Sequence, residues 1–409
     1  TYDHNVGIYV LCLYSDNDIH INKGFKGQVC ESLSTQWNQM YIFAIILLSF
    51  FAYLEVFNRD IVERNKVLFA FICFAFLVFH DGFRWETGCD WIPYSRYFDK
   101  LFVDYTLENP TFEIGYFLFL APIRLVTDNY SVYLIIHAII FYSLIFYSIF
   151  KLSISPFVSL LLLYMIIVPY LGANRQFLVF AVYMYGFCAL LKGKKVLFAV
   201  LMILCSFLHR SAVICLIALF ADRKIKNVYL LILLAFAITL SLSGIINELS
   251  PLMKVFIMDE KGKEKLDYYV NLSYDFSIMS TVLSIVKKSI WIGVLMIFDK
   301  KIENKPKSYY LFFNLYFVCC FFYLLFHGTI FQMFVGRALL YFNIGEMFIV
   351  PYVLMLFKPN YGKLAAMIVL SLYVTINIHK GFSNYGEGTD YFEPYKGLFI
   401  NTDYVRQYQ

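Results

Sequence analysis

Charged side chains are scarce in this sequence. Asp, Glu, Lys and Arg make up 15% of the 409 residues, whereas hydrophobic residues make up 60% and the mean hydropathy is +0.66. A soluble domain is about half apolar and about a quarter charged, so this composition excludes one. The net charge of +5 is small and spread over short loops, which gives no basis for nucleic-acid binding. The composition predicts a polytopic membrane protein with one integral domain.

Recognisable cysteine and metal-ligand patterns are also missing. Six of the nine cysteines stand inside apolar runs, where they are typical of small core residues: Cys73, Cys188, Cys205, Cys215, Cys319 and Cys320. We find no disulfide framework and no metal-ligand spacing, so we expect no metal and no cofactor. The chain also has no internal repeat and no inverted pair of halves, which argues against a secondary transporter.

Apolar runs dominate the chain from residue 40 onward. A bilayer core about 30 Å thick needs roughly 20 apolar residues for each crossing helix. The runs predict about twelve transmembrane helices, near 40–58, 67–80, 131–150, 155–171, 175–191, 196–208, 211–220, 227–246, 278–298, 309–327, 337–357 and 364–378. Lys and Arg gather in the connectors 59–66, 151, 192–195, 221–226, 299–307 and 358–363, which the positive-inside rule assigns to the cytoplasm.

Residues 112–126, FEIGYFLFLAPIRLV, do not fit this topology. The segment is apolar enough to span, but a full crossing would invert every later connector. Pro122 and Arg124 near its end favour a half-helix that enters the membrane and returns, buried against protein. The sequence therefore predicts an all-α fold with about twelve transmembrane helices and one re-entrant half-helix.

Three regions follow from this pattern. Residues 1–39 are polar and Asn-rich, and Met40 opens the first apolar run, so we hypothesise that Met40 is the natural start and that the tail is an extension or a disordered arm. Residues 40–378 form the membrane domain, with outer loops at 81–130 and 247–277. Residues 379–409 form a tail at the outer face. The second loop and the tail are rich in tyrosine, which can stack on sugars.

Charged side chains and one imidazole stand at the outer ends of four predicted helices. Arg84 and Asp90 follow the second helix, Arg175 begins the 175–191 helix, His209 and Arg210 follow the 196–208 helix, and Arg337 begins the 337–357 helix. A guanidinium group is a rigid fork of donors that matches phosphate oxygens, so converging arginines could hold a pyrophosphate without a metal. Each residue alone is typical of an interfacial anchor. Their common face favours a site.

The general base has two candidates. His209 lies between apolar residues in CSFLHRSAVIC, and an imidazole at a helix break can take a proton from a sugar hydroxyl. The alternative is a structural histidine bonded to a backbone carbonyl. Asp90 is the competing base; we expect it beside Arg84, where it stays ionised and suits the orientation of a hydroxyl.

Two further sets of charges fall inside predicted helices, where charge is costly. Lys287 and Lys288 interrupt the 278–298 segment, and we expect that segment to begin as an amphipathic helix on the outer surface rather than to place its lysines in the cavity. Glu346 is expected to pair with an arginine. Arg337 stands nine residues away, about 14 Å along one helix, so the partner has to be another arginine.

Five short motifs occur in one order: Arg84-x-x-x-Gly88-x-Asp90-x-x-x-Tyr94, Phe112-Glu113-x-Gly115, Asn174-Arg175-Gln176, Phe207-x-His209-x-Ser211-Ala212, and Arg337 to Tyr341-Phe342. This set, which covers roughly residues 40–400, resembles the EpsG family of bacterial polysaccharide polymerases, which are close in role to the Wzy O-antigen polymerases.

The resemblance implies a metal-independent glycosyltransferase with a GT-C-like helical architecture in the bacterial inner membrane. Its active site would face the periplasm or the cell exterior. The enzyme would join oligosaccharide repeat units carried on undecaprenyl pyrophosphate into O-antigen of lipopolysaccharide, capsule or exopolysaccharide. Its partners would be that lipid-linked oligosaccharide and membrane lipid. Whether a chain-length regulator binds the 247–277 loop is an open alternative.

The resemblance also implies roles for individual residues. Arg175 and Arg337 would neutralise the leaving pyrophosphate, Arg84 and Asp90 would position sugar hydroxyls, and His209 would be the candidate base. Further substrate-binding residues would be Tyr94, Gln176, Arg210 and Tyr341.

Other functions remain open at this point. A flippase for the lipid-linked repeat unit would have a similar number of helices, but its polar residues should line a path open to both sides. An O-antigen ligase would share nearly every chemical requirement. An acyltransferase with His209 as its base would need an inward-facing thioester site, which the predicted topology does not provide.

Overall fold

The computed structural model describes residues 39–103, 112–248, 278–327, 329, 331–357, 361–383 and 391–406. These residues form an all-helical protein without a β-strand, which confirms the predicted class. Their only β-type pairing is two isolated β-bridges, one between Arg84 and Gly397 and one between Gly397 and Ile400. The expectations for the tail before residue 39 and for most of the 247–277 loop lie outside the described residues.

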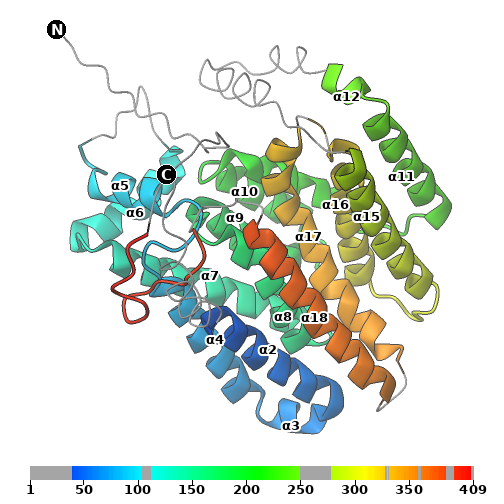
Figure 1. The fold of residues 1–409 in the computed structure, drawn as a ribbon, viewed down its shortest axis with the longest axis horizontal. Coiled ribbons are helices and arrows are strands. Elements are labelled where there is room, and N and C mark those ends of the chain that lie inside the picture. The colour runs from blue at the N-terminus through cyan, green and yellow to red at the C-terminus, as the bar shows by residue number, and fades with distance from the viewer. Residues whose placement is uncertain are drawn as a thin grey trace, which may run out of the picture.

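Helices follow one another along the chain (Figure 1). They are α2 (Gln39–Phe57), α3 (Arg59–Arg64), α4 (Lys66–Gly82), α5 (Trp91–Asp99), α6 (Ile114–Val126), α7 (Tyr130–Leu152), α8 (Pro156–Ile167), η1 (Val168–Tyr170), α9 (Asn174–Leu190), α10 (Lys195–Ser206), η2 (Arg210–Phe220), α11 (Asn227–Leu242), α12 (Ile245–Glu248), α15 (Ile278–Asp299), α16 (Lys307–Phe326), α17 (Gln332–Met355) and α18 (Tyr361–Ser383). Each of the twelve predicted apolar segments coincides with a helix. The short helices α3 and α5 were not predicted.

Five helices of the described residues are long and apolar enough to cross a membrane, by length and composition: α2, α7, α16, α18 and Gly336–Met355 of α17. They identify a membrane protein with several crossings. Other apolar helices are shorter: α10 has 12 residues and α6 has 13, or about 18 and 20 Å at 1.5 Å per residue. The length of α6 is compatible with the re-entrant path. That path, the twelve crossings and the GT-C-like architecture stay predictions.

Helix α8 forms the centre of the bundle. All twelve of its residues are buried, and it packs against α2, α7, α17 and α18. A helix that is apolar all round has no face for solvent, so a central position is the expected one. Its first amides are satisfied from a neighbour: Oε2 of Glu55 on α2 accepts hydrogen bonds from the backbone N–H groups of Phe157 at 2.9 Å and Val158 at 3.1 Å.

The segment predicted as a helix over 211–220 is the 3₁₀-helix η2. A 3₁₀-helix has three residues per turn, and the buried Ala212, Cys215 and Ala218 recur at that spacing. Their small side chains form one edge of η2, which packs against α10. The helix begins directly after His209, so the turn from α10 into η2 places the imidazole.

Helices α5 and α6 and the C-terminal segment 391–406 lie at one end of the bundle. In Figure 1, α2, α17 and α18 run diagonally, with α5 and α6 at the upper left and the red C-terminal segment below them at the left. The α15–α16 connection and α3 lie toward the lower right. The contacts described below bring the end of α4, the starts of α9 and α17, and the α10–η2 turn to the end where α5 and α6 lie.

Candidate functional site

Arg84 lies in the turn after α4 and is completely buried. Its Nη1 donates to the Asp81 carbonyl at 2.8 Å and pairs with the Asp81 carboxylate, while Nη2 donates to Oδ1 of Asn174 at 2.7 Å. Burial alone lowers the pKa of Arg84, but the Asp81 carboxylate raises it above its ordinary value, so the guanidinium stays charged. The expected position of Arg84 beside Asp90 is therefore corrected, because Arg84 instead joins the end of α4 to the start of α9. Its expected contact with sugar stays a prediction.

The C-terminal segment 391–406 holds the loop between α4 and α5. The backbone N–H of Trp85 donates to the carbonyl of Lys396 at 2.9 Å, and that of Gly88 donates to the carbonyl of Tyr391 at 2.7 Å. The loop and the tail, which the sequence analysis assigned to one side of the membrane, are thus in direct contact.

Gly88 lets this loop approach the bundle. Its φ is +113°, and a Cβ built on it would lie 2.3 Å from the carbonyl oxygen of Leu171, so only glycine fits. The next residue, Cys89, donates its N–H to the same oxygen at 2.8 Å. The loop is therefore fixed against the turn before α9, and Asp90 follows at once.

Asp90 and Arg337 form an ion pair between the start of α5 and the start of α17. The Nη1–Oδ2 distance is 3.2 Å and the Nη2–Oδ1 distance is 3.3 Å. The Arg337 side chain is 52% exposed and that of Asp90 is 23% exposed, so the pair opens to the surroundings. The buried Gln176 of α9 donates from Nε2 to the Arg337 carbonyl at 2.6 Å, which ties α17 to α9 at this point.

Arg175, at the start of α9, forms a second pair with Glu113. Nη1 of Arg175 pairs with Oε2 of Glu113, and Nε donates to the Tyr94 hydroxyl at 3.0 Å. The guanidinium carbon lies 4.0 Å from the centre of the Phe112 ring, a cation–π contact. Burial raises the pKa of Tyr94 to about 12, so its hydroxyl stays neutral. This pair is more enclosed than the first, with both side chains 17% exposed.

Helix α6 meets the end of α10 backbone to backbone. The N–H of Gly115 donates to the carbonyl of Phe207 at 2.8 Å, and a Cβ on Gly115 would lie 2.6 Å from that oxygen. Glu113 accepts from the backbone N–H of Arg210 at 3.3 Å through its other oxygen, Oε1. The absence of a side chain at Gly115 thus brings Glu113 to the turn that carries His209.

Among the described residues, the hydrogen bonds of the His209 ring are all made through Nδ1. Nδ1 accepts from the Ser211 N–H at 3.3 Å and lies 2.6 Å from Ser211 Oγ, which lies 3.0 Å from the Tyr341 hydroxyl. Burial, together with Arg175 and Arg337, lowers the pKa of His209 to about 4, against the opposing effects of Glu113 and Asp90. The imidazole is therefore neutral at pH 7, and the field of all four charged groups reaches it.

The structure brings most of the predicted residues together. Asp90, Tyr94, Arg175, Gln176, His209, Arg337 and Tyr341 belong to one network of contacts at one end of the bundle. Arg210 joins through its backbone, while its side chain is exposed. Sequence reasoning gave no role to Glu113 and Ser211, although both stood in the ordered motifs. Asp81 and Asn174 were missed because only the folded chain reveals them as partners of Arg84.

A second polar cluster lies deeper in the bundle. Nζ of Lys288 on α15 donates to the Tyr316 hydroxyl of α16 at 3.0 Å, so Lys288 faces the bundle. The expectation that it lies on the outer surface is corrected. Glu346 accepts from Trp291 Nε1 at 2.8 Å and from the Tyr373 hydroxyl at 2.7 Å. The hydrogen-bond partners of Glu346 are thus neutral donors, and the cation whose charge acts on it is Lys288 rather than the expected arginine.

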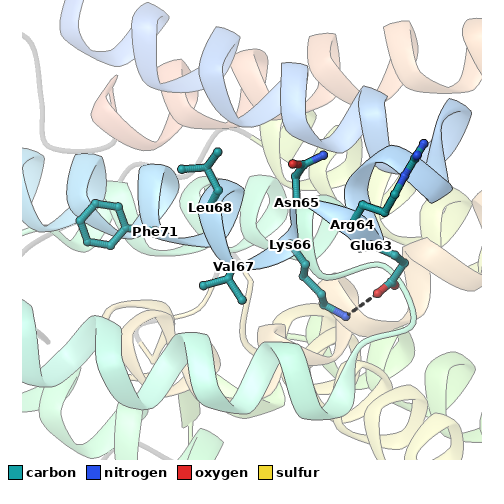
Figure 2. A pocket seen from close by; sticks show the side chains of 7 residues that line it. All are labelled: Glu63, Arg64, Asn65, Lys66, Val67, Leu68 and Phe71. Atoms are coloured by element: carbon teal, nitrogen blue, oxygen red, sulfur yellow. Dashed lines mark hydrogen bonds and ion pairs between the residues drawn. The ribbon is translucent and has the colours of Figure 1, made fainter.

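A shallow hollow lies at the far end of α4 (Figure 2). It is lined by Glu63, Arg64, Asn65, Lys66, Val67, Leu68 and Phe71, and Lys66 pairs with Glu63 at 3.3 Å. Gly82, at the other end of α4, stands 16 positions after Lys66, which is about 24 Å along the helix. The hollow is therefore separate from the candidate site.

No group of three His, Cys, Asp or Glu side chains that could hold a metal ion occurs in the part of the chain that the structure describes. The network instead offers guanidinium groups, carboxylates, hydroxyls and one neutral imidazole, a set suited to an anionic ligand with neighbouring hydroxyls. No curated protein and no solved structure matches the chain. The family model for the EpsG family matches residues 67–405. Since that match covers most of the chain, the protein belongs to the EpsG family, which indicates a role in polysaccharide biosynthesis.

Proposed function

We propose that this protein is a glycosyltransferase that polymerises oligosaccharide repeat units carried on undecaprenyl pyrophosphate. The reaction would occur at the outer face of the bacterial inner membrane and yield O-antigen, capsule or exopolysaccharide. The observation that carries the proposal is the meeting of two Arg–carboxylate pairs and His209 at one end of the helical bundle. Family membership supports the same class of substrate.

The reaction needs little covalent chemistry from the protein. The C1–O bond between the donor sugar and its diphosphate breaks, and a new C1–O bond forms to a hydroxyl of the acceptor repeat unit. The hydroxyl proton passes to a protein carboxylate and then to water, and the lipid diphosphate leaves as an anion. The site therefore has to orient two large ligands and stabilise the charge of the leaving group.

Arg175 and Arg337 are suited to bind that leaving group. Each guanidinium is already held near the site by a carboxylate, and the enclosed Arg175 has its orientation fixed before the substrate arrives. Arg337 is half exposed and can turn toward a phosphate oxygen, whereas Arg175 is enclosed and stacked on Phe112. We assign Arg337 to the outer and Arg175 to the inner part of the diphosphate site.

An O-antigen ligase is the second candidate, because it would break the same bond in the donor. A flippase is less well supported, since the charges gather at one end of the bundle rather than along a path through it. A knockout separates the three functions. Loss of a polymerase leaves single repeat units on the final acceptor, loss of a ligase leaves polymer on the carrier lipid, and loss of a flippase leaves single units facing the cytoplasm.

Alanine variants of the two arginines test the proposal. Arg175→Ala and Arg337→Ala should each reduce polymer at least 100-fold, because a donor to a developing anion is lost, while the protein still reaches the membrane. Arg64→Ala on α3 is the matched control: it also removes an arginine near a helix end, but at the far end of α4 from the site, and should leave polymer unchanged. Glycan gels from complemented knockout cells report the result. Full-length polymer from either site variant would remove the diphosphate role from that arginine.

A further inference from the structure

The hydrogen bond from the Ser211 amide determines which nitrogen of His209 carries the proton. His209 is the N-cap of η2, and its side chain accepts from the backbone N–H of Ser211 at 3.3 Å. An amide N–H can only donate, so Nδ1 must present a lone pair. A neutral imidazole has one lone pair and one N–H, which places the hydrogen on Nε2.

The hydroxyl groups next to the ring support the same tautomer. Ser211 Oγ lies 2.6 Å from Nδ1 and 3.0 Å from the hydroxyl of the buried Tyr341. If the Tyr341 hydroxyl donates to Ser211 Oγ and the Ser211 hydroxyl donates to Nδ1, each of these three side chains has a hydrogen-bond partner. A proton on Nδ1 would instead face the Ser211 N–H, two donors toward each other.

The charged groups around the ring also disfavour its protonation. Arg175 on α9 and Arg337 on α17 oppose a positive imidazole, and Glu113 before α6 and Asp90 before α5 favour it. Burial is the largest effect, and the resulting pKa of about 4 leaves the ring neutral over the pH range in which cells grow.

The other ring nitrogen is left for a ligand. No described residue accepts a hydrogen bond from Nε2 of His209, and that atom is not among the buried side-chain atoms without a partner. His80 and His137 show the opposite arrangement: Nε2 of each has a protein partner, and Nδ1 is buried without one. Of these three histidines, only His209 has its Nδ1 hydrogen-bonded and its Nε2 accessible to a ligand.

We infer that His209 donates a hydrogen bond from Nε2–H to an oxygen of the leaving diphosphate and does not act as the general base. This inference rests on the proposed function. The acceptor proton would then go to a carboxylate, and Asp90 is the better placed of the two. Both oxygens of Glu113 are engaged by two different elements, by Arg175 and by the Arg210 N–H. Both oxygens of Asp90 are engaged by Arg337 alone, in a pair that is more exposed and that opens when Arg337 turns to a phosphate.

Two substitutions separate a donor from a base. Asparagine places its side-chain oxygen near the position of Nδ1 and is a preferred N-cap, so His209→Asn keeps the cap and loses the outer donor. Glutamine extends its amide N–H₂ to the position of Nε2, so His209→Gln keeps the donor. We expect the transfer rate of purified protein to fall about 100-fold in His209→Asn and less than 10-fold in His209→Gln. The shape of the pH–rate profile between pH 3 and 8, a range that includes the pKa of about 4 of His209, should be the same in His209→Gln as in the unsubstituted protein.

Equal and large losses in both variants, or loss of the acidic limb of the pH profile in His209→Gln, would overturn the donor role in favour of a base. Thermal unfolding of both variants checks that they are folded.

A measurement of the tautomer is independent of activity. In protein labelled with ¹⁵N-histidine, the signals lost in His209→Gln belong to His209, and they should show a protonated Nε2 and a bare Nδ1 from pH 6 to 8. The reverse tautomer or an imidazolium would refute the inference even if the protein polymerises repeat units. The expected tautomer in a protein that transfers no sugar would leave the ring assignment standing and refute the proposed function.

Discussion

At the scale of single residues, burial separates arginines that look alike in the sequence. Arg84 and Arg337 both follow or begin an apolar helix, but Arg84 has no exposed surface and the Arg337 side chain is 52% exposed. A fully buried guanidinium with a carboxylate and an amide as partners contributes to the fold, whereas a half-exposed one can change partners when an anion arrives.

Replacement of Arg84 should therefore act on stability. Arg84→Met leaves the Asp81 carboxylate buried without its partner and should cost about 3–5 kcal/mol of unfolding free energy. The double variant Arg84→Met with Asp81→Asn removes the stranded charge and should recover part of that loss. Denaturation of purified protein in detergent measures both. An Arg84→Met protein as stable as the unsubstituted one but without polymer would mean that Arg84 binds substrate.

At the scale of elements, the site depends on how closely helices approach one another. The approach of α6 to the end of α10 requires Gly115, because any Cβ there would collide with the Phe207 carbonyl. A shift of α6 would also move Glu113, which holds Arg175 and the amide after His209.

Gly115→Ala should reduce polymer formation by about 10- to 100-fold, since an error of about 1 Å in the position of catalytic groups has effects of this size. Gly293→Ala is the matched control: Gly293 lies on α15 with nothing within 4 Å of a built Cβ, and alanine favours helix. It should leave polymer unchanged. Glycan gels at equal protein level compare the two. The structural account of α6 fails if Gly115→Ala is as active as Gly293→Ala.

The elements themselves were largely predictable, but their contacts were not. Runs of apolar residues located twelve segments that are each helical in the described part of the chain, because burial in lipid or protein demands length and composition that the sequence displays directly. The short helix α5 lies in a polar loop and carries no such signal. In the sequence, Glu113 resembles an ordinary loop residue, and only the contact of Gly115 with Phe207 places it at the His209 turn. The sequence around Lys288 indicated a surface position, whereas in the structure Lys288 packs against Tyr316. Such pairings depend on the fold as a whole.

At the scale of the whole molecule, the two ends of the described chain meet near the candidate site. The Tyr41 hydroxyl of α2 donates to the carbonyl of Phe392 at 2.9 Å, and the Tyr395 hydroxyl donates to the carbonyl of His80 at 2.6 Å. The rings of Tyr41, His80 and Tyr395 also pack together, with centroids 5.0 to 5.8 Å apart. The C-terminal segment is thus part of the core that supports the loop before Asp90.

Loss of this contact should destabilise the whole protein. Tyr395→Ala removes a buried ring and a hydroxyl, and should cost about 3–5 kcal/mol of unfolding free energy. Val405→Ala changes a residue of the same segment that is 80% exposed, and should cost less than about 0.5 kcal/mol. Thermal unfolding in detergent compares them. Similar unfolding curves for the two variants would show that the segment is not part of the core.

The central claim is that Arg175 and Arg337 serve one site for transfer from a lipid diphosphate. The most direct measurement is polymer formation by purified protein in liposomes that contain repeat units linked to undecaprenyl pyrophosphate. We predict that the unsubstituted protein builds polymer that stays on the carrier lipid, and that the double variant Arg175→Ala with Arg337→Ala leaves single units. Polymer of normal length and rate from a folded double variant, or no growth beyond a single unit with the unsubstituted protein, would contradict the account.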